Sequence, residues 1–149
     1  MNPSSDQVAQ RSEQLFEQGL FCAESVLQSV AESRGIQSDL IPKIATGLCS
    51  GLSRTGGICG AVSGGVLAIN LACGRNDPNQ PVENNYQRVR AFLSAFEAKF
   101  GSTNCEKLIG CRLDTPEGRQ YFQTHQLGGK CRQFTREAAR LASETLAGE

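Results

Sequence analysis

Apolar residues recur at intervals of three and four along most of this chain, which is the spacing of one face of an α-helix. The clearest stripe starts at Val82 and ends at Phe100, directly before Gly101. Its other members are Tyr86, Val89, Leu93 and Phe96. No segment shows the strict alternation of a half-buried strand. The pattern predicts an all-α fold, a single compact bundle of about five to seven helices.

Capping and stop signals place two helices in the first part of the chain. The residues 4–7, Ser-Ser-Asp-Gln, have the form of a capping box, and Gly19 interrupts the helix that they open. A second helix is expected from Cys22 to Arg34, because Gly35 follows as a stop signal.

Two further helices are expected around a glycine-containing loop at residues 51–57. Asp39 can cap the first of them, which places Pro42 in its first turn, where proline is tolerated. The other begins near Ile58, and one of its faces carries only small residues. That face allows a neighbouring helix to approach closely and permits a homodimer without requiring one. Its small residues are Gly60, Ala61, Gly64 and Ala68.

Three start signals follow residue 100. The sequence 103–106, Thr-Asn-Cys-Glu, is a second capping box and opens a short helix that ends at Ile109. Pro116 stands where proline is favoured at a helix start, and this helix is expected to end before residues 128–129. The last helix is expected to start near Cys131.

Length and charge narrow the class of protein. The 149 residues fit one domain, so we treat 1–149 as a single helical, cysteine-rich unit. Fifteen basic and fifteen acidic residues cancel, so no overall field favours nucleic acid. The start of the chain lacks the features of a signal peptide, and the longest apolar stretch, 57–73, is too short and too rich in small residues for a membrane span. We therefore expect a cytoplasmic protein without membrane insertion.

Sulfur is the distinctive chemistry of the chain, which has seven cysteines beside one histidine and one methionine. An odd number cannot form a complete intramolecular disulfide framework, and no two cysteines have the Cys-x-x-Cys spacing. This excludes zinc-ribbon, thioredoxin-type and c-type haem attachment motifs.

Four cysteines share one kind of position, the first turn of an expected helix. A helix N-terminus has unpaired N–H groups and about half a positive charge, and it can lower a thiol pKa from about 8.5 to between about 3.5 and 7.5. A thiolate is both a nucleophile and a metal ligand. The candidate redox thiols and candidate metal ligands are therefore Cys22, Cys59, Cys105 and Cys131.

The competing interpretation of each cysteine is inert packing, because free cysteine is among the most buried residue types. We expect that role for Cys49 and Cys73, which lie on apolar faces, and treat Cys111 as a weak accessory ligand candidate. The glycines near Cys59 have two interpretations as well. Backbone lacking side chains can approach a cofactor, which makes Gly60, Ala61 and Gly64 candidate cofactor contacts, or it can serve helix packing alone.

Several motifs occur in one order along the chain. Cys22 opens a Cys-Ala-x-x-Val-Leu segment, and residues 59–64 read Cys-Gly-Ala-x-x-Gly. Residues 100–110 read Phe-Gly-Ser-x-x-Cys-x-x-Leu-x-Gly, residues 115–118 read Thr-Pro-Glu-Gly, and Cys131 follows. In this order the chain resembles the C-GCAxxG-C-C family of redox-active proteins.

The resemblance runs from Leu20 to Ala142. It implies a redox role for the four cysteines that match the family pattern. A similar domain accompanies haem in split-Soret cytochromes, where an iron–sulfur centre is associated with it. This chain has no Cys-x-x-Cys-His sequence, so the haem does not carry over. The Leu20-Phe21 pair before Cys22, and Cys49 on the third expected helix, are departures that can alter access to the site.

The sequence leaves three functions open. The first is redox chemistry at the four cysteines, either thiol–disulfide exchange or electron transfer through an iron–sulfur cluster, with an unidentified redox partner protein. The second is a non-redox sensor with a four-cysteine zinc or iron site. The third is a helical interaction module with inert cysteines. Whether the protein is an enzyme is left open, and nothing indicates a nucleic-acid partner.

Overall fold

The computed structural model describes residues 2–147, and within them the regular secondary structure is entirely helical, with no β-strand. The prediction of an all-α fold is confirmed. The eight α-helices of this part of the chain slightly exceed the expected five to seven, because short segments around the loops are helical too. The elements are α1 (Ser5–Glu17), α2 (Cys22–Ser33), the 3₁₀ helix η1 (Lys43–Leu48), α3 (Cys49–Arg54), α4 (Gly60–Cys73), α5 (Glu83–Phe100), α6 (Cys105–Ile109), α7 (Pro116–Thr124) and α8 (Gly128–Leu146).

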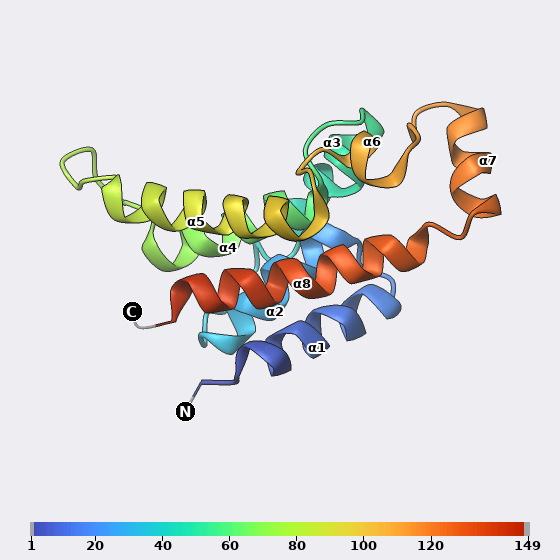
Figure 1. Cartoon of the computed structure of the whole chain (residues 1–149). Helices are drawn as coiled ribbons and strands as arrows, with labels where there is room; N and C mark the ends of the chain where they lie inside the picture. Colours follow the sequence, from blue (N-terminus) through green and yellow to red (C-terminus); the bar gives the residue numbers. More distant parts are fainter. Residues whose placement is uncertain (1, 148–149) are drawn as a thin grey trace.

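The long helix α8 organises the bundle (Figure 1). It packs against α1, α2, α4 and α5, and α2 packs in turn against α4. The short elements α3, α6 and α7 gather at one end of the molecule, away from the described ends of the chain (Figure 1). No helix within residues 2–147 combines the length and the apolar character needed to cross a bilayer.

Aromatic rings fill the space between α5 and α8. Phe92 and Phe96 are completely buried, and the ring of Phe100 lies 4.8 Å from that of Phe96 and 4.9 Å from that of Phe134. Burying rings of this size contributes about 1.5–3 kcal/mol each relative to exposure. The predicted stripe of α5 is rotated in the structure, because Tyr86 is 54% exposed while Phe92 enters the core. Gly65 on α4 makes room for the Phe92 ring.

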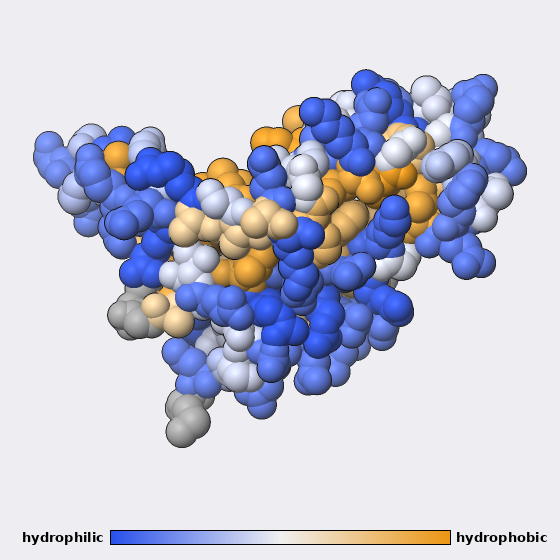
Figure 2. Space-filling view, viewed as in Figure 1, coloured by the Kyte–Doolittle hydropathy of each residue, from blue (hydrophilic) through white to orange (hydrophobic). Residues whose placement is uncertain are grey.

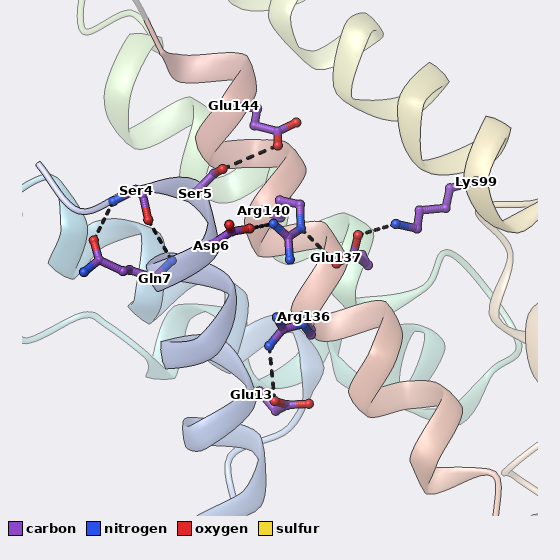
Figure 3. Close-up of polar contacts among 10 residues, drawn as sticks. All are labelled: Ser4, Ser5, Asp6, Gln7, Glu13, Lys99, Arg136, Glu137, Arg140 and Glu144. Carbon is purple, nitrogen blue, oxygen red and sulfur yellow. Dashed lines mark hydrogen bonds and ion pairs between the residues drawn. The ribbon is translucent and has the colours of Figure 1, made fainter.

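Ion pairs between side chains connect α1 to α8 (Figure 3). Arg140 pairs with Asp6 of α1, and Arg136 donates to Glu13 at 3.3 Å. Glu137 is only 7% exposed, and its carboxylate is bound by Lys99 from α5 and by Arg140 at 3.0 Å. These partners compensate the cost of burying a carboxylate between three helices.

Capping signals are confirmed at both ends of the bundle. Ser4 and Gln7 form the predicted capping box of α1 (Figure 3). The second start signal, at 103–106, also opens a helix, but the cap is Asn104 and not Thr103, because the Asn104 side chain accepts from the backbone N–H of Lys107 at 2.9 Å. Gly101 ends α5 with a φ of 90°, the left-handed conformation that glycine adopts most easily.

The prediction of a helix capped by Asp39 is wrong. The chain forms turns until Pro42 and then only the 3₁₀ helix η1, and Leu40 and Ile44 are 54% and 56% exposed. Proline disfavours the α conformation in the residue before it, so a helix capped at Asp39 cannot run through Ile41. The last helix also differs from expectation, because it starts at Gly128, three residues before Cys131.

Candidate functional site

A cavity of about 390 Å³ lies at the end of the molecule formed by α3, α6 and α7. The wall of the cavity is largely apolar and includes phenylalanine and leucine side chains, and apolar surface is visible in this region (Figure 2). Arg54 and Arg119 add two positive charges to the lining. The structure brings all four cysteines singled out in the sequence to this cavity, each from a different helix or helix start: Cys22, Cys59, Cys105 and Cys131.

Backbone hydrogen bonds hold two of these cysteines at one junction. The N–H of Cys59 donates to the carbonyl of Thr103 at 2.8 Å, and the N–H of Cys105 donates to the carbonyl of Gly57 at 2.7 Å. The Asn104 side chain adds a bond from its Nδ2 to the carbonyl of Gly56 at 2.9 Å. Helices α4 and α6 therefore start side by side, although 45 residues separate their first positions in sequence.

The segment α3 contributes an unusual backbone to the same wall. Its residues 50–54 all have positive φ values, between 57° and 70°, so it is a left-handed turn rather than an ordinary helix. Such a conformation costs roughly 1–2 kcal/mol for each non-glycine residue. A β-carbon on Gly51 would lie 2.5 Å from Cβ and 2.8 Å from Sγ of Cys105. The turn therefore presents bare backbone to this cysteine.

Cys59 is the N-cap of α4, one residue earlier than the predicted first turn. Burial raises the pKa of its thiol, the N–H groups of Val62 and Ala61 oppose that rise, and Cys105 adds to it, with a result of about 11. The expected stabilisation by the helix start is therefore present, but desolvation exceeds it.

The neighbouring thiols are also held in their neutral form. Burial raises the pKa of Cys131 to about 12, with smaller contributions from the nearby Cys59, Cys105 and Cys111. Cys131 is the fourth residue of α8, and its own N–H donates to the Leu127 carbonyl within the helix. Burial likewise raises the pKa of Cys105, followed by the charges of Cys111 and Glu106. For Cys59, Cys105 and Cys131 the predicted lowering of the thiol pKa is wrong.

Cys49 lies beside Cys22, which the sequence did not reveal. A hydrogen bond with Cys22 and then burial raise the pKa of the Cys49 thiol, while the N–H groups of Glu24 and Ala23 oppose the rise. A β-carbon on Gly60 would lie 2.3 Å from Sγ of Cys22 and 3.1 Å from Cα of Cys49. No local signal marks Cys49, because only the packing of η1 against α2 creates this pair.

The other candidates have different places. Gly60 lines the cavity, whereas Ala61 and Gly64 do not, and a β-carbon on Gly64 would lie 2.6 Å from the Ala23 carbonyl oxygen. Gly64 therefore serves the contact between α2 and α4. Cys111 and Cys73 are outside the lining, and Cys73 donates to the carbonyl of Ile69 at 3.3 Å.

The arrangement of possible metal ligands further characterises the site. Among residues 2–147, no group of three or more His, Cys, Asp and Glu side chains is arranged to hold one metal ion. The cavity therefore presents four thiols around a volume, rather than a tetrahedral site closed on a single ion.

Comparison with known proteins identifies a family. Residues 20–145 match the sequence model of the family described as "Putative redox-active protein (C_GCAxxG_C_C)". Neither the curated proteins nor the solved structures include a match. The family match covers most of the chain and contains all seven cysteines. The chain belongs to the C_GCAxxG_C_C family of redox-active proteins.

Proposed function

We propose that this protein is an electron carrier that binds an iron–sulfur cluster in the cavity, with four cysteine thiolates as ligands. The observation that carries the proposal is the convergence of four cysteines from four separate helices on one largely apolar cavity. Four thiolates are the usual ligand set of such clusters, so the donor chemistry fits. The proposed ligands are Cys22, Cys59, Cys105 and Cys131.

The environment of Cys59 and Cys131 supports a cluster over free thiol exchange at these two residues. A nucleophilic cysteine needs a thiolate at neutral pH, but burial raises the pKa of Cys59 to about 11 and that of Cys131 to about 12. A cationic core replaces the thiol protons and compensates the desolvated negative charge.

The spacing supports a core with several iron atoms. Ligands that share one ion must approach one another closely, whereas cluster ligands bind different iron atoms and stand further apart. Four cysteines line one cavity of about 390 Å³, and the described part of the chain, residues 2–147, has no group arranged for one ion, which fits the second arrangement. This favours a cluster over the four-cysteine zinc or iron sensor.

Residues of this chain would position the cluster and form its surroundings. The N–H groups of Ala61 and Val62 point at Sγ of Cys59, where they would help to set the reduction potential. The rings of Phe122 and Phe134 line the cavity and would give a bound cluster apolar neighbours. When bound, a cluster supplies one-electron transfer.

The direct test is to purify the protein without oxygen, reconstitute it with iron and sulfide, and record visible absorption and metal content. We expect charge-transfer bands with matching iron and sulfide. Replacing any one of the four cysteines by alanine should remove most of the bound iron, whereas Cys73→Ala, outside the cavity, should retain it. A folded wild-type protein that takes up no iron and sulfide contradicts the proposal. A colourless protein that binds stoichiometric zinc supports the sensor instead.

A further inference from the structure

Cys49 and Cys22 form a pair of thiols that the proposed cluster does not explain. Cys49 is 4% exposed and is not among the residues that line the cavity. Its Cα and the Sγ of Cys22 both border the small space beside Gly60, where a β-carbon would be 3.1 Å from one and 2.3 Å from the other. The absence of a side chain at Gly60 thus lets the two cysteines meet.

The surrounding structure holds the two backbone segments in place. One carboxylate oxygen of Glu24 accepts from the N–H of Phe21 at 2.9 Å, and the other accepts from Oγ1 of Thr46 at 2.8 Å. The Glu24 side chain therefore connects the start of α2 to η1. Cys22 lies at this start of α2, and Cys49 directly follows η1. Ala45 is completely buried beneath the connection.

The two thiols differ in access from outside. Cys22 is half-buried and faces the cavity, so a small reagent can reach it there. Cys49 lies behind it, close to the backbone N–H groups of Ala23 and Glu24 at the start of α2. An accessible thiol with a second thiol behind it is the arrangement of an attacking and a resolving cysteine.

We propose that Cys22 and Cys49 form a reversible disulfide, with a small-molecule disulfide such as oxidised glutathione as the oxidant. Cys22 first loses its proton and attacks one glutathione sulfur, which forms a mixed disulfide and releases one glutathione. Cys49 then attacks Sγ of Cys22 while its proton passes to the departing second glutathione, so this step needs no free Cys49 thiolate. Two protein thiols are oxidised, one glutathione disulfide is reduced, and the two protons end on the two glutathione thiols.

The disulfide would also regulate the cavity, a consequence that rests on the proposed function. A Cys22 sulfur bonded to Cys49 cannot be a thiolate ligand, so three of the four ligands remain. Oxidation of the empty protein would then prevent cluster uptake until a reductant restores Cys22.

Peptide mapping tests the disulfide without reference to a cluster. The full-length protein, reduced and freed of metal, is treated with oxidised glutathione, alkylated and digested with trypsin. Cleavage after lysine and arginine places Cys22 in the peptide 12–34 and Cys49 in the peptide 44–54. We expect these two peptides to be linked, and linked again after a cycle of reduction and oxidation. A fully alkylated Cys49, or a link from Cys22 to a peptide that contains another cysteine, overturns the proposal.

Two variants complement the peptide mapping, one that lacks the resolving thiol and one that serves as a control. Cys49→Ser should stop the reaction at a stable glutathione adduct on Cys22, because the resolving thiol is missing, and its circular dichroism shows whether it is folded. Cys73→Ser should give the same linked peptide as the wild type. A linked 12–34/44–54 peptide in a protein that never takes up iron upholds the disulfide and rejects the proposed function. Equal cluster uptake before and after disulfide formation rejects the regulatory consequence.

Discussion

Gly51 and Cys105 lie so close together that a β-carbon on the glycine would be 2.5 Å from Cβ of the cysteine. The glycine stands in a left-handed turn with a φ of 66°, and the cysteine begins α6. Through this contact the turn at residues 50–54 packs against Cys105, which lines the cavity. It explains why glycine, and no larger residue, fits the wall at that point.

Replacing Gly51 by alanine should therefore act on stability and on the site together. The positive φ costs alanine about 1–2 kcal/mol, and the clash with Cys105 adds about 1–3 kcal/mol of overpacking. We expect a lower urea midpoint and a loss of iron uptake. Gly35→Ala is the matched control, because its φ is 68° and its surroundings are open. Equal effects of both variants on iron uptake would contradict a role for this contact.

The cap of α6 provides a second test. Asn104 accepts from Lys107 and also donates to the carbonyl of Gly56, so Asn104→Ala removes a helix cap and a tie to the start of α4. We expect a loss of about 1 kcal/mol from the cap, with a further loss from the tie. A reconstituted cluster should also be lost faster to a chelator. Ser4→Ala removes the cap of α1, far along the chain, and should lower stability without changing the rate of loss.

The buried carboxylate of Glu137 predicts a purely structural effect. Lys99→Met removes one of its two cationic partners and leaves Arg140 (Figure 3). We expect the free energy of unfolding to fall by about 1–3 kcal/mol, because a partly unsatisfied buried charge is costly. Lys107→Met, at an exposed position, should change it by less than about 0.5 kcal/mol. Urea unfolding measures both, and no difference between them would show that Arg140 alone satisfies the carboxylate.

The pair between Arg11 and Glu32 predicts an acid dependence. The hydrogen bond from Arg11 lowers the pKa of Glu32 below its ordinary value, with further lowering by Gln28. The contribution to stability is therefore present above the unfolded-state pKa and is lost as the pH falls through the folded-state pKa. Between pH 7 and pH 3 the wild type should lose more stability than Arg11→Met. Parallel curves for the two proteins would contradict this coupling.

Much of the fold could be predicted because its signals are local. Capping residues satisfy helix N–H groups within one turn, so Ser4 identified α1, and the signal at 103–106 identified α6 although its cap is Asn104 and not Thr103. Gly101 identified a stop through its own backbone freedom. The error at Asp39 is also local in origin, because Pro42 disfavours the α conformation in the residue before it. The rotation of α5 was different, because it depends on Gly65 of another helix.

The cysteines of the candidate site could be predicted from the sequence, but the environment of their thiols could not. The order of motifs and the helix-start positions singled out the four cysteines that line the cavity. The pKa of three of them shifts in the direction opposite to expectation, because burial outweighs the helix start, and burial belongs to the assembled bundle. Cys49 went unrecognised for the same reason, since its neighbour Cys22 is supplied by a different segment.

The sequence by itself determined the helical class, most helix ends, the family and the set of candidate cysteines, since these follow from periodicity, capping and motif order. Only the tertiary structure decided that four helices bring their cysteines to one cavity. It also decided that burial raises the pKa of Cys59, Cys105 and Cys131 and that Cys22 meets Cys49. The physical reason is that distance, desolvation and charge coupling between thiols arise from contacts among residues far apart in the chain, which no local pattern encodes.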